Sequence, residues 1–142
     1  MLFKSMDANL PDFCHLPLLF GPDGKKLSKR HGDTSVEAFK SKGILSEAMF
    51  NYLCLLGWSP GNDLEKFNID TAINKFDLKN VLPNSAIFDE KKLLWLNGLY
   101  IRSTDTKDFQ AKALSQIEND IARELFDEEK SRLIKIFPSV QE

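Results

Sequence analysis

The sequence predicts a mainly α-helical protein, a helical bundle preceded by one short strand and a hairpin. An apolar run, His15 to Phe20, leads directly into the turn sequence Gly21-Pro22-Asp23-Gly24, which indicates a buried strand and a tight reversal. After residue 34 the apolar residues recur at helical spacing. Side chains that cap helices stand before several of these periodic segments.

The strand content is expected to be confined to the hairpin around Pro22-Asp23-Gly24, with no sheet beyond residue 40. The helices should then follow one another along the chain. Thr34 and Glu37 have capping-box spacing and predict a short helix from about Ser35 to Gly43.

The remaining helices are predicted in the same way, from a cap and an apolar face. Ser46 is expected to cap a helix that ends at Gly57, Asp70 one that runs through Phe76, and Asp89 one that runs through Asn97 and closes at Gly98. Beyond Thr104 apolar residues repeat every four positions, at Phe109, Ala113, Ile117 and Ile121, and predict a further helix. A last helix is expected to start at the acidic run Asp127-Glu128-Glu129, with an apolar face formed by Leu133, Ile134 and Phe137.

The composition suits one small domain or two half-domains. The chain has 142 residues, 42% apolar and 28% charged, with a net charge of -2, so any nucleic-acid contact must come from local basic patches. Cys14 and Cys54 lack the further ligands that a zinc site needs, and we expect two reduced thiols, no metal site and a reducing compartment. No stretch is long enough to span a membrane, so an intracellular location is expected.

The loop from Gly24 to Gly32 holds four cations and one hydroxyl between two glycines. Lysine and arginine give charge-assisted hydrogen bonds to phosphate oxygens, and the flanking glycines permit close approach to a ligand. Mutual repulsion among the cations favours a mobile loop that an anion would order. The alternative is a solvated charged turn.

This loop and the strand before it resemble the second signature of class I aminoacyl-tRNA synthetases, in the form carried by bacterial and organellar glutamyl-tRNA synthetases. The central string is Lys26-Leu27-Ser28-Lys29-Arg30. Further motifs follow in the order of that family over roughly the first hundred residues: Thr34-Ser35-Val36, Asn51-Tyr52-Leu53, Leu56-Gly57-Trp58-Ser59-Pro60-Gly61, Phe88-Asp89, Lys92-Leu93-Leu94-Trp95-Leu96-Asn97-Gly98 and Tyr100-Ile101-Arg102.

The resemblance implies a role for each matching residue of the loop. Lys29 matches the catalytic lysine that contacts ATP phosphates as glutamate attacks the α-phosphate to form glutamyl-adenylate. Lys26, Ser28 and Arg30 match the rest of an ATP-binding loop. Leu18 and Leu19 match the pair that lies beside the adenine. ATP, with Mg²⁺ accompanying it, is the implied substrate.

The resemblance also implies a division of the chain and a missing part. Residues 1–33 match the end of the Rossmann-type catalytic domain, residues 34–103 a helical stem-contact domain, and residues 104–142 the start of a helical anticodon-binding domain. The other nucleotide signature, of the His-Ile-Gly-His type, is not found in this sequence. We therefore expect a synthetase fragment that lacks the N-terminal half and is inactive by itself.

The segment from Asp89 to Arg102 is a candidate tRNA contact. Lys91, Lys92 and Arg102 are candidates to touch phosphates, and Trp95 or Tyr100 to stack on a base. The alternative favoured by residue type is that Trp95 and Leu96 are core and the lysines are solvated.

Two classes of function stay open. The first is a part of a glutamate-tRNA ligase, a monomer acting on glutamate, ATP and tRNA(Glu) in a bacterial cytoplasm or an organellar matrix. The second is a standalone helical tRNA-binding module without catalysis. Glutaminyl relatives are less consistent with the sequence, because their anticodon part is built from β-barrels and this chain continues as helices.

Overall fold

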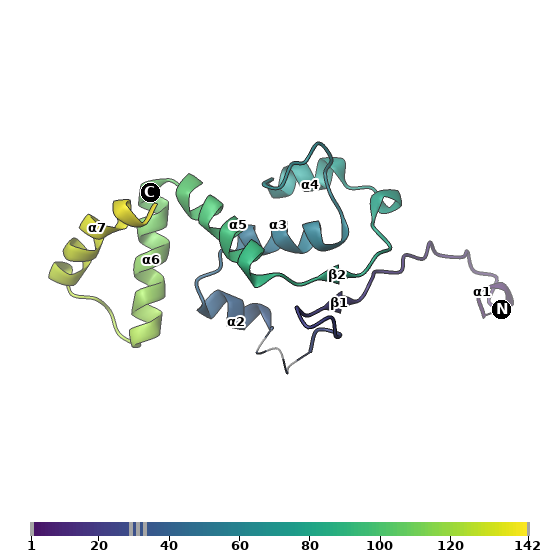
Figure 1. Ribbon diagram of the computed structural model, residues 1–142, viewed down its shortest axis with the longest axis horizontal. Helices are drawn as coiled ribbons and strands as arrows, with labels where there is room; N and C mark the ends of the chain where they lie inside the picture. Colours follow the sequence, from purple (N-terminus) through teal and green to yellow (C-terminus); the bar gives the residue numbers. More distant parts are fainter. Residues whose placement is uncertain (1, 29, 31, 33, 142) are drawn as a thin grey trace.

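The computed structural model describes residues 2–28, 30, 32 and 34–141, and these residues are mainly helical. The N-terminal segment extends away from the rest, helices α2 to α5 form the middle of the molecule, and α6 and α7 pair at the opposite end (Figure 1). The elements are α1 (Leu2–Ser5), β1 (Leu19–Phe20), α2 (Val36–Ser41), α3 (Ser46–Gly57), α4 (Ile69–Lys75), the 3₁₀ helix η2 (Leu78–Asn80), β2 (Ala86–Ile87), α5 (Glu90–Ser103), α6 (Thr106–Ile121) and α7 (Asp127–Gln141).

The main core lies between α3 and α5, which cross with their apolar faces together. Leu93 and Leu96 of α5 are fully buried there, and Tyr52 of α3 is nearly so. The other buried members of this cluster are Phe39, Ile44, Met49 and Phe88. A second cluster of Trp58, Phe67 and Ala72 fixes α4 against the end of α3. The helical periodicity of the sequence predicted these helices, and the structure shows which of their residues fill the core.

The prediction that strand content stops at the hairpin is wrong. β1 pairs in parallel with β2, with Leu19 opposite Ala86 and Phe20 opposite Ile87. The reversal itself is present, because Phe20 and Lys26 form an antiparallel bridge. A strand of two residues has no periodicity to detect, and its partner lies more than sixty positions earlier in the sequence.

For three of the four predicted caps, the observed cap position lies one or two residues away. Ser35 caps α2 in place of Thr34, with its Oγ accepting from the Ala38 N–H at 3.2 Å. Asn68 caps α4 in place of Asp70. Ser46 is the first residue of α3, and the cap position is Leu45, which has no side-chain acceptor.

The fourth predicted cap, Asp89, is confirmed, since its Oδ1 accepts from the N–H groups of Lys91 and Lys92. The predicted end of this helix is wrong, because α5 continues through Gly98 to Ser103. Glycine weakens a helix interior but does not end one when neighbouring turns are held by packing, as they are here by Leu93 and Leu96.

Helices α6 and α7 form a hairpin in which Phe109 packs edge-on against Phe137, with ring centroids 5.7 Å apart. The predicted helix with apolar residues at four-residue spacing is confirmed, starting two residues after Thr104 and capped by Asp105. The acidic run Asp127-Glu128-Glu129 begins α7, as predicted. Gln141 closes the hairpin by donating to the carbonyls of Ile101 and Thr104.

Candidate functional site

The basic loop leaves β1 through a tight, hydrogen-bonded reversal. The Gly21 N–H donates to the Lys25 carbonyl at 2.8 Å, and the Leu27 N–H donates to the Leu19 carbonyl at 2.8 Å. Gly24 sits at the turn with a φ of +70°, a conformation that side chains disfavour. The reversal therefore returns the chain beside β1 with Lys26 at its edge.

Leu27 anchors the loop to the helical part of the protein. Its side chain packs against the core cluster that contains Phe39 and Phe88. The residues on either side of it, Lys26 and Ser28, are exposed. Burial of the central leucine of the motif thus fixes the loop to the core and keeps its polar neighbours at the surface.

The predicted ATP-binding residues lie close together in sequence and differ in exposure. Leu18 is 53% exposed and Leu19 is half-buried in β1. Arg30 is exposed and approaches Asp23, with 3.9 Å between Nη2 and Oδ2. Lys29, the predicted catalytic residue, lies outside the described residues.

Asp23 stands directly before this loop and moderates its positive charge. Its Oδ1 accepts from the Lys25 N–H at 3.0 Å, and its Oδ2 faces Arg30. The pair with Arg30 is long and solvent-exposed, so its energetic contribution is small. An entering phosphate can therefore compete for the guanidinium at little cost.

A short chain of contacts joins the loop to α5. Beyond β2, the Phe88 N–H donates to the Phe20 carbonyl at 2.8 Å. The next residue, Asp89, caps α5, and its N–H donates to the hydroxyl of Tyr52 at 2.7 Å. The strand that begins the loop is consequently fixed to the start of α5.

The five candidate nucleic-acid residues on α5 fall into two groups. Trp95 is 46% exposed, so the expectation that it belongs to the core is wrong, although that expectation holds for Leu96. Lys91 and Arg102 are also exposed. These three side chains remain open to a ligand.

The other two candidates, Lys92 and Tyr100, are engaged within the protein. Lys92 forms an ion pair with Glu65 at 2.7 Å. The Tyr100 hydroxyl donates to Asn51 Oδ1 or the Phe67 carbonyl, at 2.8 and 2.6 Å, and burial raises the pKa of this phenol. Tyr100 is therefore a structural residue and not a stacking platform.

Two buried asparagines were not singled out from the sequence as structural residues. Asn51 accepts from the Phe67 N–H and donates to the Glu65 carbonyl, and so fixes the segment before α4 to α3. Asn97 accepts from the Leu45 N–H and donates to the Gly43 carbonyl. Both asparagines belong to motifs that the chain shares with the family it resembles. A polar residue within the apolar face of a predicted helix was the sequence signal that could have indicated their structural role.

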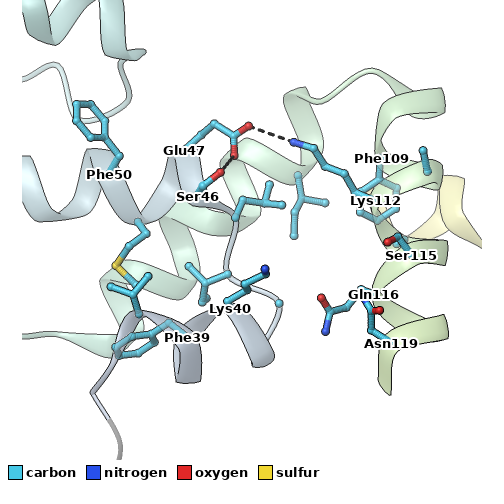
Figure 2. Close-up of a pocket in the computed structure, with 18 of the residues that line it drawn as sticks. Phe39, Lys40, Ser46, Glu47, Phe50, Phe109, Lys112, Ser115, Gln116 and Asn119 are labelled. Atoms are coloured by element: carbon cyan, nitrogen blue, oxygen red, sulfur yellow. Dashed lines mark hydrogen bonds and ion pairs between the residues drawn. The ribbon is translucent and has the colours of Figure 1, made fainter. Parts of the chain in front are cut away.

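A large pocket of about 1080 Å³ lies between α2, the start of α3 and α6. Its lining is mostly apolar, with Phe39, Met49 and Phe109 among the contributors. Figure 2 shows Lys112 reaching from α6 toward Glu47, with which it forms a 3.1 Å ion pair. The Glu47 carboxylate accepts hydrogen bonds from its own backbone N–H, from Lys112 and from Ser46. These bonds lower the pKa of Glu47. The described residues of the basic loop do not contribute to this lining.

Over the described part of the chain, no three acidic, histidine or cysteine side chains converge as a metal site would require. In the same residues no helix has both the length and the apolar character needed to cross a membrane.

Comparison with known proteins gives a consistent family. The family model described as tRNA synthetases class I (E and Q), catalytic domain, matches residues 1–95. The chain is 43% identical over 130 residues to glutamate--tRNA ligase 2 of Caldicellulosiruptor saccharolyticus, covering 91% of this chain and 27% of that protein. It is 51% identical over 113 residues to glutamate--tRNA ligase of Legionella pneumophila, covering 80% of this chain and 24% of that protein.

The structural comparison agrees with the sequence comparison. A crystal structure of a glutamate tRNA ligase from Elizabethkingia meningosepticum superposes with a TM-score of 0.77 at 28% identity, covering 99% of this chain and 31% of that one. The chain thus spans less than a third of the length of the relatives it matches.

Proposed function

Since this chain belongs to the class I (E and Q) tRNA synthetase family, we propose that it is part of a glutamate-tRNA ligase, which activates glutamate with ATP and transfers it to tRNA(Glu). The observation that carries the proposal is the basic loop directly after β1, which Leu27 anchors to the core and which lies within the stretch that the family model matches. The relatives that carry the same stretch are glutamate--tRNA ligases.

Lys29 is the catalytic residue in this proposal, and Lys26, Ser28 and Arg30 complete the phosphate-binding loop. Charge develops on the α-phosphate and the leaving pyrophosphate as glutamate attacks, and a positioned cation stabilises that charge. Leu18 and Leu19 would lie beside the adenine. The anchoring of Leu27 supports this arrangement, because it holds the loop at a fixed place on the core while its polar residues face outward.

Mg²⁺ would enter with ATP. The nucleotide phosphates would supply oxygen ligands for it, and the described residues of this chain do not form a carboxylate cluster. The chain's own contribution to phosphate binding is its cations.

The proposed division assigns residues 1–33 to the end of the catalytic domain, 34–103 to the stem-contact domain and 104–142 to the start of the anticodon-binding domain. Lys91, Lys92 and Arg102 were the candidate tRNA contacts, and the ion pair of Lys92 with Glu65 leaves Lys91 and Arg102 as the stronger two. The whole protein would act as a monomer in a bacterial cytoplasm or an organellar matrix.

A segment replacement tests this function. The matching segment of the Legionella pneumophila glutamate--tRNA ligase is replaced by this chain, and glutamate-dependent ATP–pyrophosphate exchange is measured with saturating tRNA(Glu) transcript. We expect exchange within about tenfold of the parent enzyme, because a loop in the correct place restores the same stabilising charges.

A folded replacement protein without exchange would overturn the proposal. Circular dichroism and the melting temperature establish folding, and a shorter replacement limited to residues 15–34 separates the loop from its helical support.

The isolated chain should form no glutamyl-tRNA, because positioning of both reactants is worth about 7–11 kcal/mol and the chain spans under a third of the length of its relatives. Tight tRNA binding by the chain together with an inactive, folded replacement would favour the tRNA-binding module.

A further inference from the structure

The pocket of about 1080 Å³ between α2, the start of α3 and α6, called here the α3–α6 pocket, has the size and position of a small-molecule site. Such sites usually measure about 300–1000 Å³ and often lie where two parts of a protein meet. The α6–α7 pair forms one end of the molecule and α2 to α5 form its middle, so the pocket lies where these two parts meet (Figure 1).

One wall of the pocket is apolar and partly open to solvent. This wall comes from α2 and α3, where Phe39 and Met49 are buried and Val36 and Leu53 are 62% and 46% exposed. A ligand that covers the two exposed side chains removes apolar surface from water, which is favourable. The wall therefore suits the apolar body of a ligand.

The charged side chains that line the pocket are Lys40, Glu47 and Lys112. Glu47 and Lys112 pair with each other at 3.1 Å, and Glu47 also accepts from the Ser46 hydroxyl at 3.0 Å. Lys40 is exposed, and no carboxylate of the described residues lies within ion-pair distance of its ammonium group. The pocket therefore has one uncompensated positive charge beside its apolar wall.

The opposite wall, from α6, supplies polar side chains, namely Ser115, Gln116 and Asn119. Figure 2 shows Gln116 on the α6 side of the pocket, facing Lys40 on the α2 side. The Gln116 Nε2 group donates to Asp120 Oδ1 at 3.0 Å, which orients the amide and leaves its oxygen as an acceptor. A few hydroxyl and amide groups of this kind fix the orientation of a ligand in a mostly apolar site.

We propose that the α3–α6 pocket binds a small amphipathic anion, with its apolar body on the α2–α3 wall and its carboxylate or sulfonate beside Lys40. Charge complementarity selects this occupant, because the described lining residues offer a free cation and no free carboxylate. A ligand in this place contacts both α3 and α6, and so restrains the α6–α7 pair relative to the rest of the protein. The inference does not depend on the proposed function, since the pocket is lined by residues that all follow residue 35.

Two fluorescent probes of similar shape and different charge test the proposal on the full 142-residue chain. Anilinonaphthalene sulfonate is an aromatic anion, and phenylnaphthylamine has the same ring skeleton without the sulfonate. Both emit more strongly in apolar surroundings, so a titration gives a dissociation constant for each. The comparison of the two probes separates the contribution of charge from that of the apolar wall.

Substitutions of the charged lining residues should change the affinity of the anionic probe in opposite directions. Lys40→Gln should weaken its binding about fivefold, because the free cation is lost and the length of the side chain is kept. Glu47→Gln should tighten its binding by a similar factor, since it removes the lining carboxylate and frees Lys112. The neutral probe should bind both variants as it binds the wild type.

Leu53→Gln should weaken the binding of both probes at least threefold, because it removes apolar surface from the wall. The matched controls lie on α4, where Ile73→Gln changes an exposed apolar side chain and Lys75→Gln an exposed cation. Neither control should change the affinity of either probe. Pocket variants that bind both probes as the wild type does would overturn the proposal.

Amide resonances locate the bound probe, which is necessary because apolar side chains are also exposed on α4 and in the N-terminal segment. Addition of the anionic probe should shift the backbone resonances of Lys112 and Gln116, with the dissociation constant that fluorescence gives. Shifts confined to α4 or to residues 2–18 would overturn the proposal.

The replacement protein tests whether the pocket binds the same probe in a complete ligase. We expect the anionic probe to bind there with the same dependence on Lys40 and Leu53. Loss of this binding in a folded replacement protein would mean that another protein segment fills the pocket, and would overturn the proposal. Pyrophosphate exchange is measured without the probe, so the proposed function stands or falls separately.

Discussion

The N–H of Asp89 donates a 2.7 Å hydrogen bond to the hydroxyl of Tyr52. Asp89 is both the cap of α5 and the residue that follows Phe88, whose own N–H bonds to β1. One phenol therefore ties α3 to the point where the strand pair ends and α5 begins. Its ring is in the core, edge-on to Phe88 with 5.3 Å between centroids.

Tyr52→Phe should lower the free energy of unfolding by about 1–2 kcal/mol. The ring is kept, so the loss comes from leaving the Asp89 N–H without its acceptor in a partly buried place. Urea unfolding followed by circular dichroism measures the change. Ser41→Ala removes an exposed hydroxyl that bonds to Glu37 and should change stability by less than about 0.5 kcal/mol.

Asn51→Leu should lower the free energy of unfolding further than Tyr52→Phe does, with a loss of about 2–4 kcal/mol relative to the wild type. The amide is fully buried, and the change leaves the Phe67 N–H and the Glu65 carbonyl unpaired while removing an acceptor for Tyr100. The same unfolding measurement applies. Asn74→Ala, at an exposed position of α4, is the matched control, and equal effects at the two asparagines would contradict the role of the buried network.

The sequence was sufficient to locate most of the helices and insufficient for the residues that fill the core and for features set by contacts distant in the chain. The periodic residues of α3 and α6 marked real helices, because a buried face imposes its spacing on the sequence. The pairing of β1 with β2 involves two residues on each side and left no pattern. The observed caps of α2 and α4 lie one or two residues from the predicted ones. Ser35 and Asn68 have side-chain oxygens that can accept the free N–H groups of the first turn, as Thr34 and Asp70 can.

The basic composition of the candidate site is plain in the sequence, while the exposure of its residues is not. The anchoring of Leu27, which leaves Lys26 and Ser28 exposed on either side, depends on the positions of Phe39 and Phe88 and left no signal in the loop sequence. Exposure of Trp95 could not be read from its spacing, since it neighbours the fully buried Leu96 and either residue fits the apolar face.

The junction of α6 and α7 should be sensitive to acid. The Arg123 guanidinium, together with the N–H of Phe126, lowers the pKa of Glu129 to about 2. A carboxylate with a lowered pKa stabilises the fold above its unfolded value of 4.5, and that contribution is lost as the pH falls from there toward 2. The amide resonance of Phe126, which donates to Glu129 at 2.9 Å, should therefore titrate with a midpoint near 2.

Glu129→Gln provides the control for this titration. It removes the charge but keeps an oxygen that can accept from Phe126, so the resonance should no longer respond in that pH range. Glu128→Gln should leave the Phe126 titration in place, since the Glu128 side chain is exposed and its ion-pair partner among the described residues is Arg132, at 4.0 Å. A midpoint near 4.5 in the wild type would contradict the role of Arg123.

Lys29→Ala should slow adenylate formation by about a hundredfold to a thousandfold in the replacement protein. A preorganised cation that acts mainly in the transition state lowers kcat when removed and changes the KM for ATP much less. Lys25→Ala is the matched control, because Lys25 stands outside the five-residue motif and an exposed cation contributes little by itself. Pyrophosphate exchange with saturating tRNA measures the step directly. Small and equal effects of the two substitutions would mean that the loop is a solvated charged turn, and the family membership would then stand without this mechanism.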